Sequence, residues 1–266
     1  MNRSMCHRRE RGMSGIRGFT IIELSIVLVV VALLLGTFIT PLSNQVDQRS
    51  YGDTQRRLQD IGEALIGYAV ANGRFPCPAS SGVGGWEAFA TGGTPGSTTN
   101  GICASFSGYV PGIQLGLTTM DSQGYAIDAW TSVQNRIRYV ITNQTVNGVT
   151  NPFTAASTPT SGMRGAGVGG LGTTCPYLSV STGGFVLPIC NPPAGTSPPP
   201  GVLSNGDAVF VLYSVGKDAT DQQTGGGGLI FRSELFSIPT PPFDDQVLWV
   251  SRYTVINRMI QGGQLP

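Results

Sequence analysis

The sequence predicts an α+β protein in which one long N-terminal helix packs on a small antiparallel sheet with long Gly- and Pro-rich loops. Two observations predict this class. Residues 19–72 follow a helical pattern that is apolar at first and amphipathic afterwards. The rest of the chain contains short runs of strand type, and its loops draw on 38 Gly and 18 Pro, about a fifth of all residues.

The helix begins with an apolar run, FTIIELSIVLVVVALLLGTFI, over residues 19–39. These 21 residues, at about 1.5 Å each, are enough to cross a bilayer core. Five arginines lie among residues 1–18, and basic residues on that side favour keeping the N-terminus in the cytoplasm. We therefore expect a single-pass protein of the cytoplasmic (inner) membrane, with its body in the periplasm or outside the cell.

Three other interpretations of this run fit less well. A cleavable secretory signal has an apolar region of about 7–15 residues and an A-x-A-like site, whereas this run is longer and GTFITPLS offers no such site. A plain membrane anchor leaves Glu23 unexplained, because a carboxylate in hydrocarbon is costly without a partner. A buried core helix rarely contains so long an apolar stretch.

Residues 41–73 continue the helix in amphipathic form, so one face is predicted to pack against a globular head. Pro41 lacks a backbone donor and is expected to kink or open the helix locally. Gly73 is the expected C-cap. The apolar positions at helical spacing are Leu42, Val46, Leu58, Ile61, Leu65 and Tyr68.

Beyond the helix, Pro76 and Pro78 end the helical pattern and loops rich in Gly, Ser, Thr and Pro begin. Residues 208–214, AVFVLYS, are nearly all apolar and are expected to form a central strand. The predicted strands are 136–142, 208–214, 229–232 and 247–250, and residues 252–261 are predicted to form a final helix.

Charge and histidine content exclude several classes of function. Outside residues 1–18 there are 11 basic and 14 acidic side chains and no basic stripe, so no nucleic-acid partner is expected. His7 is the only histidine, which leaves the body without Ser-His-Asp or Cys-His catalysis and without His metal ligands. The chain has no P-loop and no G-x-S-x-G elbow. We therefore do not expect an enzyme.

The segment GFTIIEL, residues 18–24, resembles the prepilin processing site of type IV pilins and type II secretion pseudopilins. That family pattern is a Gly, then a Phe, then a Glu as the fifth residue of the mature chain, followed by an apolar helix. The resemblance implies that prepilin peptidase cuts between Gly18 and Phe19, and that the new Phe19 amine is methylated. Glu23 would then pair with the Phe19 amine of a neighbouring subunit, which offsets the cost of a carboxylate in hydrocarbon. The alternative start residues are Met1, Met5 and Met13, the last of which gives a short leader.

The resemblance implies four parts: a leader peptide (1–18), a transmembrane and assembly half of the helix (19–40), its amphipathic half (41–73), and a globular α+β head (74–266). The expected function is that of a structural subunit, a minor pilin or pseudopilin, of a type IV pilus or type II secretion filament. The expected partners are other pilin or pseudopilin subunits, prepilin peptidase and the inner-membrane assembly platform. The alternative is a helix-tethered adhesin or ligand-binding tip protein, with binding by loops 79–108 and 191–206 and by Trp86.

Four phrases of the head also resemble those of pseudopilins and minor pilins, and their order along the chain carries the resemblance. They are the Pro-Cys-Pro turn at 76–78, Asp128-Ala129-Trp130 before a strand, Ser214-Val215-Gly216-Lys217-Asp218 after a strand, and the closing segment 243–251. The Gly that usually follows Asp-x-Trp in the family is Thr131 here.

Cys6 lies in the leader, so the mature body keeps Cys77, Cys103, Cys175 and Cys190. Four cysteines outside the cytoplasm indicate two disulfides, for which three pairings exist. Proximity in the sequence favours Cys77 with Cys103 and Cys175 with Cys190. A Cys₄ zinc site is the alternative, but it needs closely spaced cysteine pairs that this sequence lacks.

Asp218, Asp221, Asp244 and Asp245 flank a Gly-rich stretch at residues 225–228. Calcium prefers oxygen ligands, carboxylates above all, and some type II secretion pseudopilins hold calcium in a loop near this point. These four aspartates are therefore a candidate calcium site, with no EF-hand spacing. Solvated aspartates in turns are the alternative interpretation. No other cofactor is expected.

Overall fold

The structure is a computed structural model. It describes residues 18–82, 84–91, 102–130, 135–171, 187–190, 203–221, 223, 231–232 and 244–266, and within these it leaves out the side chains of residues 36–44, 91, 187–190, 203–207 and 232. The chain divides into two compact units, Met1–Asp47 and Gln48–Pro266.

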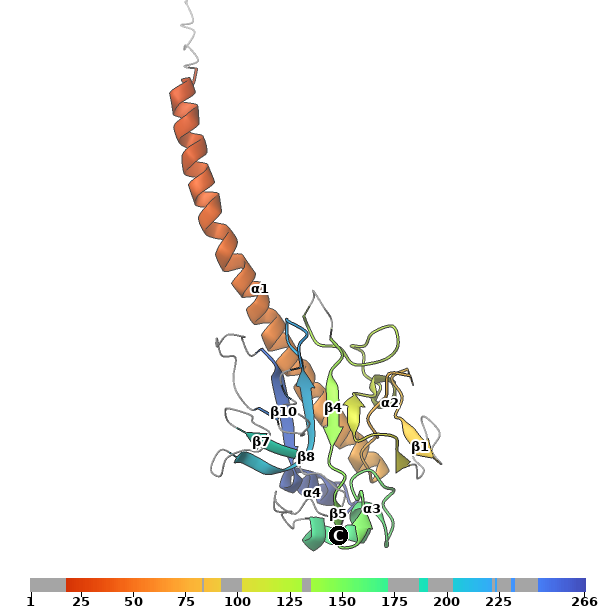
Figure 1. Ribbon diagram of the computed structural model, residues 1–266. Helices are drawn as coiled ribbons and strands as arrows, with labels where there is room; N and C mark the ends of the chain where they lie inside the picture. Colours follow the sequence, from red (N-terminus) through yellow and green to blue (C-terminus); the bar gives the residue numbers. More distant parts are fainter. Residues whose placement is uncertain are drawn as a thin grey trace, which may run out of the picture. The chain divides into compact units, whose positions relative to one another are not determined.

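Helix α1 runs from Ile21 to Asn72 and contributes residues to both units (Figure 1). The helix continues through Pro41, where the sequence predicted a kink or a local opening. Its end is the predicted one: Gly73 has a left-handed φ of +72°, and its N–H donates to Ala69 O at 2.8 Å. Glycine is favoured at this position because it has no Cβ to strain a positive φ.

In the second unit, one face of α1 is buried in the core. Leu58, Ile61 and Leu65 on this face are at most 4 % exposed, as the amphipathic pattern predicted. Val46, which the same pattern placed on this face, belongs to the first unit and is 53 % exposed. The packed face therefore starts later along α1 than the sequence suggested.

The main sheet of the second unit has the strand order β3-β4-β8-β7-β9, with β10 also paired to β8 (Figure 1). Its strands are β3 Ser107–Tyr109, β4 Arg138–Ile141, β7 Leu187–Cys190, β8 Leu203–Ser214, β9 Phe231–Arg232 and β10 Gln246–Ser251. All pairs are antiparallel except β7 with β9, which is parallel. The predicted α+β class is thus confirmed, and the antiparallel arrangement holds for every strand pair of this sheet but one.

Strand β8 is central because it is apolar on both faces. Phe210 and Leu212 join the cluster that contains the buried face of α1. Val211 and Tyr213 point to the opposite face and form a second apolar cluster with Phe231 of β9. A strand buried on both faces is apolar at successive positions, which explains the run AVFVLYS. The sequence predicted this strand to be central.

Smaller elements complete the second unit. Two short hairpin-like pairs are β1 Phe89–Thr91 with β2 Ile102–Cys103, and β5 Thr145–Val146 with β6 Val149–Thr150. The remaining helices are α2 Gly112–Leu115, α3 Gly162–Leu171 and α4 Arg252–Gln261. Helix α4 has the predicted bounds. It begins at Arg252 because the side chain of Ser251 caps it, accepting the N–H of Thr254 at 3.3 Å.

Candidate functional site

The predicted processing site lies at the start of α1, in the first unit. Gly18, Phe19 and Thr20 are non-helical, and the helix begins immediately after them. Thr20 caps the helix, since its Oγ1 accepts the N–H of Glu23 at 3.2 Å. The Gly18–Phe19 peptide bond therefore lies outside the helix.

Glu23 occupies the first turn of α1, where a carboxylate interacts favourably with the positive end of the helix dipole. Thr20 and Glu23 also have the spacing of a capping box, Thr-x-x-Glu. Glu23 is the only charged residue between Gly18 and Asp47. One carboxylate thus stands at the beginning of a long uncharged segment.

The side chains around Glu23 form a continuous apolar surface. Every Phe, Ile, Leu and Val from residue 19 to residue 35 is between 43 % and 90 % exposed. Monomeric soluble proteins rarely expose contiguous apolar patches above a few hundred Å², so a surface of this kind indicates an interaction. Within the part of the chain that the structure describes, no helical segment combines the length and the apolar character needed to cross a membrane.

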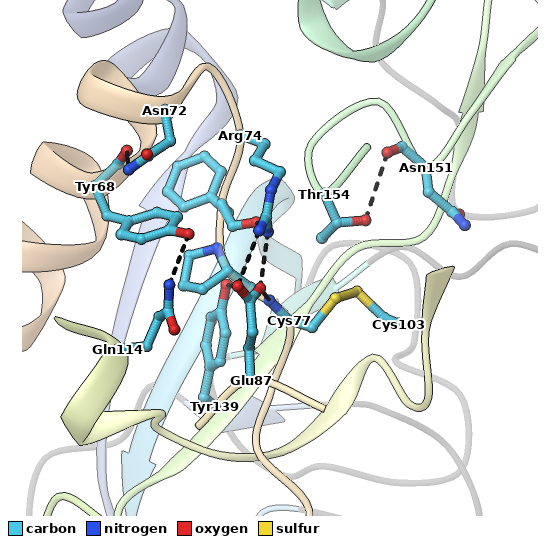
Figure 2. A network of polar contacts seen from close by, with 12 residues as sticks. Tyr68, Asn72, Arg74, Cys77, Glu87, Cys103, Gln114, Tyr139, Asn151 and Thr154 are labelled. Carbon is cyan, nitrogen blue, oxygen red and sulfur yellow. Dashed lines mark hydrogen bonds and ion pairs between the residues drawn. A yellow bond between two sulfur atoms is a disulfide. The ribbon is translucent and has the colours of Figure 1, made fainter. Parts of the chain in front are cut away.

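Directly after α1, a buried ion pair joins Arg74 to Glu87 (Figure 2). The two contacts are Nη1 to Oε2 at 2.8 Å and Nη2 to Oε1 at 2.9 Å, and the side chains are 1 % and 0 % exposed. Burial lowers the pKa of Arg74, but the hydrogen bonds and charge of Glu87 outweigh it, so that the pKa is raised. Glu87 Oε2 also accepts the N–H of Cys77 at 3.1 Å.

Aromatic rings surround this ion pair. Arg74 Cζ lies 5.8 Å from the ring centroids of both Tyr68 and Phe89. Tyr139 donates its hydroxyl to Pro76 O at 3.1 Å, and Pro76 follows Arg74 by two residues in the chain. Burial raises the pKa of both tyrosine hydroxyls, which therefore stay protonated. Sequence reasoning missed this cluster, although Glu87 is the only charged residue between Arg74 and Asp121.

The structure describes one of the two predicted cysteine pairs. Cys77 and Cys103 form a disulfide with a Cα–Cα distance of 5.3 Å, as their proximity in the sequence favoured. Cys175 and the side chain of Cys190 lie outside the described residues, so their pairing stays a prediction.

A second buried polar cluster centres on Asp128, which is 1 % exposed. Its Oδ1 accepts the N–H groups of Trp130 (3.2 Å) and Asn135 (3.1 Å), and its Oδ2 accepts the hydroxyl of Ser214 at 2.7 Å. Asn135 in turn donates to Gly216 O at 2.7 Å. Burial raises the pKa of Asp128, while its hydrogen bonds oppose the rise. Two phrases that resemble pilin-type heads, Asp-x-Trp and Ser-x-Gly-x-Asp, are thereby brought together.

Helix α1 is tied to this cluster within the second unit. Thr54 Oγ1 accepts the N–H of Ala129 at 3.0 Å, and Arg57 donates to Ile127 O at 3.1 Å and to Asp128 O. The polar side chains of α1 thus fix the loop before β4. The amphipathic pattern alone gave no partner for Arg57.

The closing segment joins the same region through Asp244. Its Oδ2 accepts the backbone N–H groups of Lys217 (2.6 Å) and Asp218 (3.2 Å). Burial raises the pKa of Asp244, and these N–H bonds oppose the rise. Gly216 is required beside it, because its φ is +69° and an added Cβ would stand 2.4 Å from Asp244 Cγ.

Asp218 also acts in a turn, since its Oδ1 accepts the N–H of Thr220 at 2.8 Å. Asp221 accepts the hydroxyl of Tyr213 at 3.0 Å and the N–H of Gln223 at 3.1 Å, and Asp245 is buried at 2 % exposure. Across the described residues, no three or more His, Cys, Asp or Glu side chains are arranged to hold a metal ion. Residues 224–230, which contain the Gly-rich stretch, lie outside the described residues, so the calcium site stays a prediction.

Comparison with known proteins gave no relative for this chain. No protein-family model matches the sequence, no curated protein matches it significantly, and no solved structure matches it significantly.

Proposed function

We propose that this chain is a structural subunit, a minor pilin or pseudopilin, of a type IV pilus or type II secretion filament. The observation that carries the proposal is the apolar surface of residues 19–35, with the single carboxylate of Glu23 one turn from the Gly18–Phe19 bond. In the sequence the apolar run continues to residue 39, which gives it the length of a bilayer core. The segment first anchors the subunit in the inner membrane and then packs among the helices of neighbouring subunits.

The position of Glu23 supports assembly rather than simple anchoring. Removal of the leader would leave a new ammonium group on Phe19, at the positive end of its own helix. A carboxylate from a neighbouring subunit stabilises that ammonium, and the ammonium offsets the cost of holding Glu23 in an apolar environment. Such pairing sets the register of one helix against the next.

The head fits this role as an extracytoplasmic domain. The Cys77–Cys103 disulfide is typical of an oxidising compartment such as the periplasm. The partners are then prepilin peptidase and the inner-membrane assembly platform, followed by other subunits in the filament. In the alternative, a tip adhesin, Trp86 was the candidate contact residue, and it is half-buried.

Processing is tested by the intact mass of the membrane-extracted protein from cells with active prepilin peptidase. We expect a chain that begins at Phe19 and carries one added methyl group. A Gly18→Val variant should keep its leader, whereas Gly15→Val, which leaves the cleaved bond unchanged, should be processed normally. A wild-type chain that retains residues before Phe19 would overturn the proposal.

Assembly is tested separately with Glu23→Gln, which keeps the shape of the side chain and removes its charge. We expect normal processing but at least a tenfold loss of incorporation into filaments, a change of about 1.4 kcal/mol in partition. Ser25→Ala is the matched control, because Ser25 Oγ only donates to Ile22 O of its own helix at 2.8 Å. Counting subunits in the wild-type filament separates a structural subunit, present in many copies, from a tip protein, present in few.

A further inference from the structure

We propose that the Cys77–Cys103 disulfide and the Arg74–Glu87 ion pair form one redox-sensitive lock, which fastens the segment after α1 to the head only while the disulfide is closed. The lock consists of these four residues (Figure 2). The inference is independent of the proposed function, because it rests only on contacts within the second unit.

The two halves of the lock meet at Cys77. Its Sγ is bonded to Cys103, and its N–H donates to Glu87 Oε2 at 3.1 Å (Figure 2). The same oxygen accepts Arg74 Nη1 at 2.8 Å. One residue therefore carries the covalent bond and also fixes the carboxylate of the ion pair.

The backbone pairing next to Glu87 is short, and the disulfide reinforces it. Glu87 stands just before β1, which pairs, in the part of the chain that the structure describes, with the two-residue strand β2 through Phe89–Cys103 and Thr91–Ile102. A two-stranded pair is at best marginally stable on its own, and this one is unusually short. Ala88 donates to Pro78 O at 3.3 Å and accepts the N–H of Ala104 at 3.0 Å, and Gly85 O accepts the N–H of Ile113 at 3.1 Å. Among the described restraints that keep β2, β1 and Glu87 next to Cys77, the disulfide is the covalent one.

Loss of this restraint has a defined consequence for Arg74. Its side chain is 1 % exposed, and a buried guanidinium that loses its carboxylate must gain water. Residues 74–79 would then leave their places against Tyr139, which donates to Pro76 O, and against Tyr109, which bridges to Ala79. The end of α1 lies next to this segment, since the Tyr68 ring is near Arg74.

The lock opens by exchange with a dithiol reductant. A thiolate of the reductant attacks one sulfur of the disulfide, forms a mixed disulfide and releases the other cysteine as a thiolate. The second thiol of the reductant then displaces the remaining cysteine. In total, two electrons and two protons pass from the dithiol to Cys77 and Cys103, and the reductant leaves as a disulfide. A disulfide-bearing oxidant closes the lock by the reverse exchange.

The test is hydrogen exchange by mass spectrometry on the full chain in detergent micelles, because the amide at position 77 reports directly on the bond to Glu87. The Cys77→Ser/Cys103→Ser variant should exchange at least tenfold faster than wild type over residues 74–79 and 87–89, with β4 and β8 unchanged. The Cys175→Ser/Cys190→Ser variant is the matched control and should stay protected. Adding dithiothreitol to this control should produce the same fast exchange, and reoxidation should reverse it.

Two results of these measurements would overturn the inference. Protection of residues 74–79 within twofold of wild type, after loss of the Cys77–Cys103 bond, would show that the ion pair stands without the disulfide. Loss of protection throughout β4 and β8 as well would make the disulfide a global staple and not a local lock. A Glu87→Gln variant adds a third criterion: its disulfide should stay closed while residues 74–79 exchange faster. Unchanged exchange in this variant would remove the ion pair from the lock.

Discussion

Replacing Glu87 by Gln should destabilise the head more than replacing both partners of its ion pair by apolar residues. Glu87→Gln keeps the size of the side chain and still offers an acceptor to the N–H of Cys77. It removes the negative charge opposite Arg74, which is 1 % exposed and cannot be hydrated in place. Removing one partner of a buried ion pair costs about 3–5 kcal/mol.

The double variant Arg74→Met/Glu87→Leu removes both charges together with their desolvation cost. Exchange of a buried ion pair for apolar residues of similar volume is often neutral or stabilising. The N–H of Cys77 then loses its acceptor, which costs about 1–3 kcal/mol. We therefore expect the double variant to lie within about 2 kcal/mol of wild type and to be more stable than either Arg74→Met or Glu87→Leu alone.

The assay is the cooperative unfolding of the purified full chain in detergent, followed by tryptophan fluorescence, with the closed disulfide verified by mass. In domains of this size, 1 kcal/mol shifts Tm by about 2–4 °C, so the Glu87→Gln variant should lose about 6–20 °C. The double-mutant cycle of Arg74→Met, Glu87→Leu and their combination should give an interaction energy of at least about 2 kcal/mol. If the double variant lost as much stability as the sum of the two single variants, the side chains would be acting independently and this reasoning would fail.

Two further predictions concern glycines and acidity. Gly216→Ala should destabilise the head by about 1–3 kcal/mol, because it combines a positive φ with a Cβ 2.4 Å from Asp244 Cγ. Gly67→Ala, in an exposed helical position with no atom within 4 Å of the new Cβ, should stabilise the head by about 0.5–1 kcal/mol. Denaturant titrations measure both changes, and equal effects of the two substitutions would contradict this contrast. Burial raises the folded-state pKa of Asp244 above its ordinary 3.8, so the folded head binds this proton more tightly and loses stability as pH rises from 3.8 through the raised pKa. Asp244→Asn should flatten the measured stability over that range, and an unchanged slope would exclude Asp244 as the cause.

Local signals in the sequence were enough to place the helix ends. Gly73 ends α1 and Ser251 starts α4 because each satisfies backbone groups of its own helix. The central strand was also predictable, since AVFVLYS is apolar at successive positions and β8 is buried on both faces. In each case the physical cause lies within a few residues of the element it determines.

The buried polar clusters could not be predicted in this way, because their partners are distant in the sequence. Asp128 and Ser214 are 86 positions apart and meet only once β8 is in place beside β4. The parallel pairing of β9 with β7 likewise depends on the course of the chain between them, which no local pattern encodes. The two motifs that meet at Asp128 are visible in the sequence, but their contact depends on the pairing of β4 with β8, which the sequence pattern does not specify.

A lone charge is nonetheless an informative signal in a chain with only 12 % charged residues. Glu87, the only charge in a long uncharged stretch, has Arg74 as its partner inside the head, because an isolated buried carboxylate is too costly to keep. Glu23 is the corresponding lone charge of the apolar part of α1. Among the described residues, its backbone N–H donates to Thr20 Oγ1, which caps the helix. By the same reasoning, if that apolar surface is covered as we propose, Glu23 would need a cation as a partner. In the filament that we propose, the ammonium group of a processed Phe19 would be that cation.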